Sequence, residues 1–517
     1  MAKRKQAASK TVQTFPHSST ISWFHIVVLS VVYWVVYYYV SNREHIDLNG
    51  DNFAYYLLGK MLAMGKGYTN YSSIHPTPHN HFPPAFPFII SILIGLFDAE
   101  MKDIVVWISM FFYVAILVFY FTLCRIQSSA AIAFVVSLFL AINPLMLASA
   151  NTCMSEIPFV LFSILGIYFL VKSSSEKAFR SWKLLLSVVF FAIGYYTKTL
   201  GVSLFAAMFC YFLFSKKGKH LFVSTISYIV LVLPWYIRGK RVGSSYMNQL
   251  VLTNPYRPEL GNLTFNTFFQ RVQSNFVRYI SLDIPNAIFS MKPTTRETPI
   301  LFWIVGFGII AFVLLGIYRL KEYKVFFLAY IMATFAILLA WPDSFGGLRF
   351  VEVLVPAFLF LMIYGLSQML QLGFSKIGLS FSPYWLLLFV LFMMTGIKIL
   401  KIELQQSIVP NYANYIGLAK WAKGNTPKDA VFSARKPEIF IYYSERMTIN
   451  YVNSLNDKEV LEGFRENGVN YVVLEQLGFS STTRYLYPAI LKNAQKFPIL
   501  VQMKNPDTFL LKFDDTK

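Results

Sequence analysis

The feature that most constrains the fold of this chain is a succession of long apolar runs that are almost free of charge. A helix needs about 20 consecutive apolar residues to cross a bilayer, and several of the runs reach or approach that length. Hydrophobic residues make up 56% of the 517 residues and charged residues only 14%, far from the composition of a soluble globular protein. The sequence therefore predicts an α-helical polytopic membrane protein.

The apolar runs predict about eleven membrane spans. The first is Trp23–Val40, and no small-residue cleavage site follows it, so we interpret it as a retained span and not as a signal peptide. The run at 82–97 is excluded because it is short, begins with prolines and ends at Asp98; we expect it to lie at the membrane interface. The other spans are predicted at 105–123, 130–148, 157–171, 184–196, 200–214, 221–235, 299–318, 325–341, 350–372 and 385–400.

The positive charge of the chain supports this choice of spans. Lys and Arg number 46 and Asp and Glu 26, which gives a formal net charge of +20. The cations stand in short clusters between apolar runs and form no single basic face, so we expect no nucleic-acid partner. With 82–97 excluded, the positive-inside rule assigns every cluster to the cytoplasmic side. The clusters are the basic tail at 1–20, Arg125, 172–183, 216–219 and 319–324.

The topology stays open at Lys198. The two apolar arms around this residue are each about 14 residues long, which is short for a complete crossing. They form either two short spans or one bent helix, and the second arrangement would invert every later span.

The predicted topology leaves three polar regions on the outer side of a membrane domain at 21–400. They are the loops 41–103 and 238–298 and the tail 401–517. In the tail, β-rich pieces alternate with a helical stretch near Asp457–Glu466, which predicts a small α/β domain. The β-rich pieces are 430–433, 439–443, 471–474 and 509–513. The tail has no glycine-rich phosphate loop, so no nucleotide-sugar site is indicated there.

Two carboxylates are placed where chemistry is possible. Asp51 follows Gly50 at the start of an amphipathic stretch, where it is either a helix N-cap or a general base at the membrane surface. Glu156 lies at the outer tip between two spans, where it is either a helix-start acid that the helix dipole favours or a second carboxylate across a cavity from Asp51.

Three cations lie near the same outer surface. Lys198 interrupts an apolar region, which favours a functional role, although a lysine there can also extend to the interface. Arg238 and Arg349 mark the outer ends of two spans. Their convergence would suit an anionic ligand such as a phosphate, and ordinary interfacial anchoring is the alternative.

Histidines and cysteines give little sign of a metal. His75, His79 and His81 cluster in a proline-rich stretch, but no fourth zinc ligand is evident, and we interpret them as polar contacts within the loop. The three cysteines have no C-x-x-C spacing and predict neither a disulfide framework nor a metal site.

Taken together, several short motifs resemble the bacterial polytopic glycosyltransferases of the GT-C fold, the family 39-like group that contains protein O-mannosyltransferases and the aminoarabinose transferase acting on lipid A. The motifs are Gly50-Asp51-Asn52-Phe53-Ala54-Tyr55-Tyr56, Gly65-Lys66-Gly67-Tyr68, His81-Phe82-Pro83-Pro84-Ala85-Phe86-Pro87, Ser155-Glu156, Tyr196-Thr197-Lys198, Pro234-Trp235-Tyr236-Ile237-Arg238, and Arg349 ahead of Pro356. The protein O-mannosyltransferases usually have Glu after the Asp of the first motif, and this chain has Asn52 there.

The resemblance implies transfer of a sugar from a polyprenyl-phosphate carrier to a lipid, glycan or protein hydroxyl on the periplasmic face of a bacterial inner membrane. It assigns the base to Asp51, and we assign substrate contacts to Tyr55, His81 and Tyr196, which lie in the motifs. We expect no cofactor beyond the lipid-linked donor, and no metal is indicated.

The residue types fit this chemistry. A positioned carboxylate removes the proton of an attacking hydroxyl, a contribution of roughly 10² to 10⁴ in rate. Cations neutralise the departing lipid phosphate, and a single displacement inverts the anomeric centre. A polytopic transporter or flippase of a lipid-linked or anionic substrate is the main alternative, and a non-catalytic scaffold is another. A transporter, however, predicts repeated halves and short loops, which this chain lacks.

Overall fold

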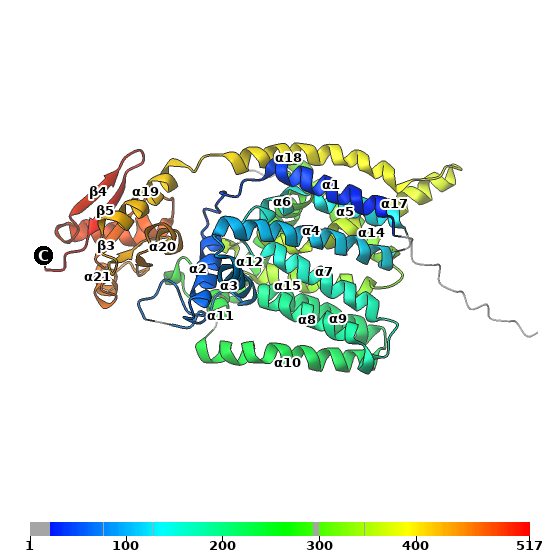
Figure 1. The fold of residues 1–517 in the computed structure, drawn as a ribbon, viewed down its shortest axis with the longest axis horizontal. Helices are drawn as coiled ribbons and strands as arrows, with labels where there is room; N and C mark the ends of the chain where they lie inside the picture. The colour runs from blue at the N-terminus through cyan, green and yellow to red at the C-terminus, as the bar shows by residue number, and fades with distance from the viewer. Residues whose placement is uncertain are drawn as a thin grey trace, which may run out of the picture.

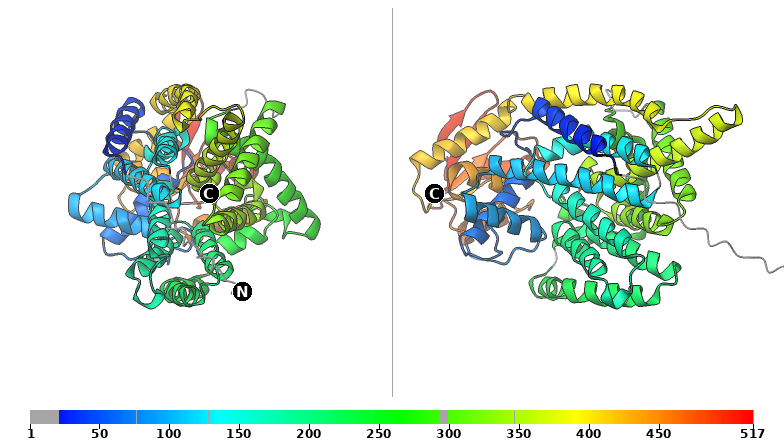
Figure 2. Two further views of the ribbon diagram at one scale, coloured as in Figure 1. Left: turned by 90° about the vertical axis from the view of Figure 1, so that its right-hand side faces the viewer. Right: turned by 45° about the vertical axis from the view of Figure 1, so that its right-hand side comes forward.

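A computed structural model describes residues 21–75, 77–127, 129–243, 245–292, 299–345 and 347–516. The basic tail at 1–20 lies outside the described residues. Long helices run side by side as a bundle, and a smaller domain of strands and short helices lies at one end of it (Figure 1). In the left-hand view of Figure 2, which looks along the bundle, several of these helices are seen almost end-on and others are tilted. The bundle helices are α1 (Trp23–Val40), α4 (Met101–Ile126), α5 (Ala130–Ala141), α6 (Pro144–Ala150), α7 (Glu156–Ser173), α8 (Trp182–Thr197), α9 (Val202–Phe214), α10 (Gly218–Val242), α14 (Ile300–Arg319), α15 (Lys324–Ala340), α17 (Val355–Lys376) and α18 (Val390–Gln405).

The number of spans is confirmed in part. Within the described ranges, seven helices are long and apolar enough to cross a membrane, and eight if the α5–α6 pair, bent by 56°, is one span. The bend lies at Asn143, whose side chain caps α6, and Pro144 follows at the first helical position. Helices α8, α9 and α15 are apolar but shorter. That each of these three crosses the membrane, which would bring the number of spans to about eleven, stays a prediction.

The break at Lys198 is a hairpin and not a bend. Lys198 has an extended backbone between α8 and α9 and lies beside Glu156, the first residue of α7. At the far end of α9, the Lys217 ammonium donates to the carbonyl of Ser174, just beyond the last residue of α7 (3.1 Å). Helix α9 therefore returns to the end of the bundle from which α8 departs, and the single bent helix is wrong.

Helices α14 and α17 approach closely because small residues lie between them. A Cβ atom at Gly316 of α14 would lie 2.1 Å from the carbonyl oxygen of Leu361, and one at Gly365 of α17 would lie 2.3 Å from that of Phe312. Such backbone-to-backbone contact is the usual way in which transmembrane helices pack without large side chains.

Between the bundle and the smaller domain lie the helices of the two polar loops (Figure 1). Helix α3 covers most of the predicted interfacial run and packs on α2, where Gly59 leaves room for Ile90. Its position at a membrane interface stays a prediction. The loop helices are α2 (Asp51–Ala63), α3 (Ala85–Phe97), α11 (Ser245–Val251), α12 (Phe265–Arg278) and α13 (Ile284–Phe289). The short helix α16 (Leu348–Val351) comes just before α17. Short 3₁₀ or π segments are Ala178–Arg180, Thr199–Gly201, Pro258–Leu260, Tyr279–Asp283, Asp343–Phe345, Glu352–Leu354, Pro383–Phe389, Thr482–Leu486 and Ala494–Lys496.

The C-terminal domain is a five-stranded mixed sheet covered by helices. Its strand order is β2-β1-β3-β5-β4, with β1 parallel to β2 and β3, and β5 antiparallel to β3 and β4. The register pairs Phe432 with Thr448 and Val473 with Leu510. The elements are α19 (Pro410–Asn425), β1 (Val431–Ser433), α20 (Pro437–Ser444), β2 (Met447–Ile449), α21 (Asp457–Glu466), β3 (Tyr471–Leu474), α22 (Tyr487–Lys492), β4 (Ile499–Met503) and β5 (Thr508–Lys512).

Most predicted elements of this domain are confirmed, and one is wrong. Residues 439–443 form part of helix α20 and not a strand. Pro437 occupies the first helical position, and Phe440 packs on Tyr415 of α19, with ring centroids 5.6 Å apart. The apolar run suited either structure, and contact with α19 decided it. Strands β2 and β4 were not predicted. The last bundle helix also runs beyond the predicted boundary at 400, to Gln405.

Candidate active site

Asp51 is the first residue of α2, and it is not the helix cap. The cap position is Gly50, whose φ of 94° lies in the left-handed region that favours glycine. A Cβ atom at Gly50 would also lie 2.3 Å from Oε1 of Glu438 in the C-terminal domain. The N-cap alternative for Asp51 is therefore wrong, and its carboxylate is available to other groups.

The Asp51 carboxylate accepts a hydrogen bond from Nη1 of Arg349, on α16. The two side chains are 26% and 38% exposed, so the pair lies partly open to a cavity. Burial alone would raise the pKa of Asp51, but the Arg349 guanidinium more than offsets it and lowers the pKa below its usual range. The carboxylate is thus ionised at neutral pH and can accept a proton.

A second ion pair lies behind the first. Nζ of Lys198 donates to Oε1 of Glu156 over 2.6 Å and also lies 3.5 Å from the carbonyl oxygen of Arg349. Glu156 is 3% exposed and Lys198 11%, so this pair is far more buried than Asp51 and Arg349. Glu156 is the first residue of α7, as the helix-start alternative predicted, and it holds Lys198.

A buried carboxyl at Glu352 was missed by the sequence analysis. Its residue is only 1% exposed, and its Oε1 atom has no hydrogen-bond partner among the described residues. It lies within electrostatic range of Glu156 and Lys198. The sequence did carry a signal for Glu352. It lies three residues after Arg349 in an apolar segment, where a charged residue is costly and is therefore often functional.

Two cavities, each of about 580 Å³, meet at Asp51. We call the first the cationic cavity, because Lys198, Arg349 and Lys436 line it. Apolar side chains form part of its wall, namely Leu200, Ile337, Leu338, Trp341, Leu348 and Phe350, and polar side chains such as Asn49, Tyr246 and Gln249 form the rest. We call the second the amide cavity, because the side chains of Asn80, Asn248, Gln249 and Asn450 line it. Residues common to both are Asp51, His81, Phe82, Gln249, Tyr256 and Phe345.

Two predicted substrate contacts lie in this region. Tyr55 lines the cationic cavity, and its hydroxyl lies 3.0 Å from Oγ of Ser155, next to Glu156. His81 lines both cavities, and its ring lies 4.9 Å from that of Tyr246. Burial lowers the pKa of His81, so its imidazole is neutral at pH 7.

Two other predicted site residues lie elsewhere. The Arg238 guanidinium donates to the carbonyl of His79 over 2.8 Å and packs on the Tyr68 and Trp235 rings, so it holds the first polar loop against α10. The Tyr196 hydroxyl donates to the carbonyl of Leu231 over 2.8 Å and joins α8 to α10. Neither is among the residues that line the two cavities, so the structure does not bring Arg238 together with Lys198 and Arg349. The roles of Arg238 at the donor phosphate and of Tyr196 at the substrate stay predictions.

The third cation comes instead from the C-terminal domain. Lys436 lines the cationic cavity, and its ammonium donates to the carbonyl of Asn49 and lies 3.8 Å from Oε1 of Glu438. Glu438 lines the amide cavity, and burial raises its pKa to about 7. Sequence reasoning missed both residues because nothing in a soluble-looking tail indicates that it folds back onto a distant loop.

The histidine cluster contains a structural residue. Nε2 of His79 accepts a hydrogen bond from the backbone N–H of Phe82 (2.9 Å), so Nδ1 carries the proton and donates to Oδ1 of Asn70 (2.7 Å). Both ring nitrogens are occupied, and His79 acts as the predicted polar loop contact. In the part of the chain that the structure describes, no group of three or more His, Cys, Asp or Glu side chains is placed to hold a metal ion.

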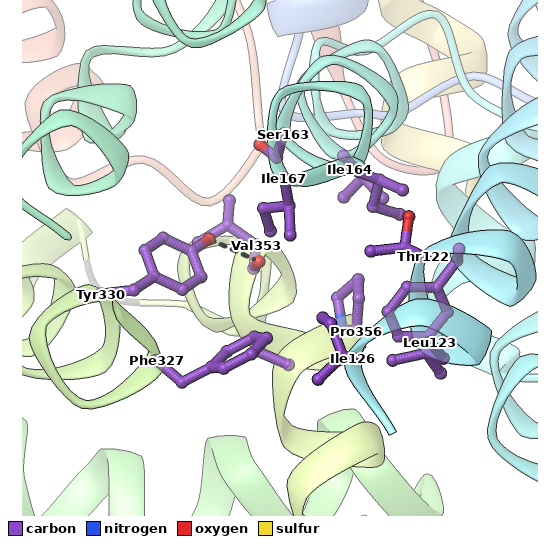
Figure 3. Close-up of a pocket in the computed structure, with 13 residues that line it drawn as sticks. Thr122, Leu123, Ile126, Ser163, Ile164, Ile167, Phe327, Tyr330, Val353 and Pro356 are labelled. Carbon is purple, nitrogen blue, oxygen red and sulfur yellow. Dashed lines mark hydrogen bonds between the residues drawn. The ribbon is translucent and has the colours of Figure 1, made fainter. Parts of the chain in front are cut away.

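A smaller hollow lies next to the segment that follows Arg349 and Glu352 (Figure 3). It has a volume of about 30 Å³ and lies among α4, α7, α15 and the start of α17. Tyr330 of α15 donates a hydrogen bond to the carbonyl of Val353 (2.9 Å) across one side of it. Its lining is almost wholly apolar and its volume that of a water molecule or two, so we regard it as a packing gap and not as a ligand site.

Comparison with known proteins gives a family match for part of the chain and a fold for most of it. Residues 81–237 match the family described as dolichyl-phosphate-mannose-protein mannosyltransferase. The match covers less than a third of the chain. A search of curated proteins gives no significant match. The matched segment includes His81, Glu156 and Lys198, whereas Asp51 and Arg349 lie outside it.

Solved structures extend the family resemblance to the fold. The crystal structure of ArnT from Cupriavidus metallidurans bound to undecaprenyl phosphate matches with a TM-score of 0.60 and 14% identity, over 94% of this chain and 97% of that one. The apo structure of the same protein matches with a TM-score of 0.58 and 13% identity, over the same shares of both chains. The fold is thus an ArnT-like GT-C fold, and the resemblance inferred from the sequence is confirmed.

Proposed function

We propose that this protein transfers a sugar from a polyprenyl-phosphate donor to a hydroxyl acceptor. The observation that carries the proposal is the position of Asp51, on the shared wall of a cavity with cations and apolar walls and a cavity with amides. A base between a donor site and an acceptor site is what direct transfer requires. The family match and the ArnT-like fold support this class of reaction.

The cationic cavity suits the donor. A polyprenyl phosphate has an anionic head and an apolar tail, and this cavity offers Lys198, Arg349 and Lys436 together with apolar side chains from α15 and α16. Cations placed against the lipid phosphate stabilise the charge that develops as the sugar leaves. Lys198, Arg349 and Lys436 are the side chains that would supply this stabilisation.

Donor binding also prepares the base. In the structure, Arg349 bonds to Asp51, and a donor phosphate would compete for that guanidinium. Once Arg349 turns toward the phosphate, the effect that lowers the pKa of Asp51 weakens and burial raises it. Asp51 is then a stronger base when both substrates are present.

The number of available carboxylates favours inversion. A retaining route needs a carboxylate nucleophile at the anomeric carbon in addition to an acid or base. Glu156 is held by Lys198, and Asp51 is the only carboxylate that lines the cationic cavity among the described residues. A single displacement with Asp51 as base therefore accounts for the site.

The test is release of free polyprenyl phosphate from a panel of lipid-linked sugars, with a membrane extract as the source of acceptor. We expect release by the wild-type protein and none above background by Asp51→Asn. The donor that responds also identifies the sugar. If no donor releases its carrier, the transporter becomes the better explanation of the cationic cavity.

We further propose that the C-terminal domain is periplasmic in a bacterial inner membrane. The basic clusters after α7 and α9 lie at the opposite end of the bundle from Lys198 and Asp51, and positive charge favours the cytoplasmic side. A phosphatase reporter fused after Lys517 is expected to be active. Activity only of a cytoplasmic reporter at the same position would reverse the orientation.

A further inference from the structure

We propose that the acceptor is a carbohydrate carrying an acidic group, carboxylate or phosphate, and that it binds in the amide cavity with the acidic group on Arg435. This inference rests on the proposed transfer reaction, because it takes Asp51 as the base that the acceptor hydroxyl meets. Arg435, Asn80, Asn248 and Asn450 line only the amide cavity, whereas Gln249 and Tyr256 line both cavities.

The first observation is a set of side-chain amides without protein partners. Within the described residues, no hydrogen bond is formed by the side chains of Asn80, Asn248, Gln249 or Asn450, all of which line the cavity. Asn248 and Asn450 are exposed and Asn80 and Gln249 are half-buried, so these amides are open to the cavity. An amide both donates and accepts, so several around one cavity fit a ligand that carries many hydroxyl groups.

The second observation is aromatic surface on the same wall. The rings of Tyr71 and Tyr256 line the cavity, and Tyr256 is 40% exposed. A pyranose ring presents an apolar face to such a ring and hydroxyl groups to the amides around it. A lipid acceptor would instead require an apolar cavity, and the apolar wall in this site belongs to the cationic cavity.

The third observation is Arg435, which lies within electrostatic range of Glu438 and Glu475 but forms no ion pair with a carboxylate among the described residues. No hydrogen bond or ion pair to its guanidinium is found among the described residues, and its Nε atom is buried without a partner. It packs on the Phe479 ring, 4.5 Å from the ring centroid, which fixes its plane. A planar guanidinium held in this way is suited to bind a carboxylate or phosphate through two hydrogen bonds.

The contrast with the other cations of the site supports an anionic ligand at Arg435. Lys198 pairs with Glu156, Arg349 with Asp51, and Lys436 lies close to Glu438. Arg435 is the cation that lines the amide cavity, where Asp51 and Glu438 are the acidic residues. A neutral hydroxyl on a peptide would leave this guanidinium unpaired.

The transfer step then balances as follows. The acceptor hydroxyl oxygen attacks the anomeric carbon of the donor sugar, and its proton passes to the Asp51 carboxylate. The bond between the anomeric carbon and the phosphate oxygen breaks, and the electron pair leaves with the lipid phosphate. Arg435 takes no part in bond making; it positions the acceptor so that one hydroxyl faces Asp51.

The experiment measures direct saccharide binding to the full-length protein in detergent, by saturation-transfer NMR. The probes are digalacturonate, mannose 6-phosphate and a neutral disaccharide. We expect both acidic probes, or one of them, to bind at least about tenfold more tightly than the neutral one, and the stronger of the two tells carboxylate from phosphate. Equal binding of acidic and neutral probes, or no saccharide binding at all, would overturn the proposal.

Variants separate this site from the surface charge of the protein. Arg435→Gln should lose most of the preference for acidic probes, whereas Arg465→Gln, at an exposed ion pair on α21, should keep it. Should Arg435→Gln fold poorly, Asn248→Asp replaces it in the test. This variant should also lose the preference for acidic probes, because a new carboxylate in the cavity repels an acidic ligand. Preserved acidic preference in both cavity variants contradicts the assignment.

Asp51→Asn distinguishes the acceptor site from the reaction. It should bind the acidic saccharide as the wild type does while transfer is lost. Saccharide binding without carrier release from any donor would refute the transferase but keep the carbohydrate site. Carrier release without saccharide binding would refute this inference and keep the transferase.

Discussion

The Asp51 carboxylate accepts a hydrogen bond from Arg349, a residue 298 positions later in the chain. This contact joins the first polar loop to the helix segment that begins the penultimate long span. It also joins the two cavities, because Asp51 lines both and Arg349 lines one. The predictions below follow from this pair and from the groups around it.

Removing the charge of Asp51 should abolish transfer and leave donor binding intact. Asp51→Asn keeps the size of the side chain but cannot accept a proton, and loss of a general base lowers the rate by roughly 10² to 10⁴. Donor binding should persist because Arg349 is freed for the phosphate. Carrier release and donor affinity are measured side by side, with Asp47→Asn, in the turn before α2, as the matched control. Equal loss in both variants would point to disturbance of the loop.

Lys436 should matter to the donor although it lies in the C-terminal domain. Lys436→Ala removes one of the three cations of the cationic cavity, and we expect kcat/KM for the donor to fall about tenfold. Lys423→Ala removes an exposed lysine of the same domain that pairs with Glu445, and it should leave turnover unchanged. Equal kinetics of the two variants would exclude Lys436 from donor binding.

The buried pair of Glu156 and Lys198 should be strongly coupled in stability. Lys198→Gln leaves a carboxylate buried without its cation, which costs about 3 to 5 kcal/mol, and Glu156→Gln strands the cation in the same way. The double variant Glu156→Gln/Lys198→Gln should be more stable than the less stable single variant. Thermal unfolding of all four proteins gives the coupling energy. Additive effects would show that the two groups do not form a pair.

Glu438 should make the protein less stable as the pH rises. Its pKa is raised from the ordinary 4.5 to about 7, so between these values the folded protein binds a proton that the unfolded chain does not. The contribution is fully present below pH 4.5 and is lost as the pH rises through 7. Glu438→Gln should remove this dependence and be the more stable protein at pH 8, by on the order of 1 to 3 kcal/mol.

Unfolding midpoints between pH 5 and 8 check this prediction. The exposed Glu466→Gln, in α21 of the same domain, serves as the control and should follow the wild type. A wild-type midpoint that does not fall over this range would show that the Glu438 carboxyl is ionised throughout.

Local sequence was sufficient for the helices and for part of the site. Apolar runs predicted the bundle because each helix satisfies its own backbone hydrogen bonds within one segment. Asp51, Lys198 and Arg349 were found because a charged residue beside or within an apolar run is costly and needs a reason. The same rule would have found Glu352.

Contacts between distant segments decided the rest. Whether α8 and α9 form a hairpin depended on where Lys198 and Lys217 lie relative to α7. Arg238 is a cation at the outer end of a predicted span, as a phosphate ligand would be. In the structure, however, its guanidinium packs on the Tyr68 ring and points toward the first polar loop.

The sequence by itself thus determined the class of the protein, most of its helices and the charged residues beside the spans that needed a reason. Only the tertiary structure decided that Arg435, Lys436 and Glu438 of the C-terminal domain line the cavities beside Asp51. The physical reason is that helix formation and membrane insertion depend on neighbours along the chain, whereas a cavity is made by side chains that folding brings together from far apart.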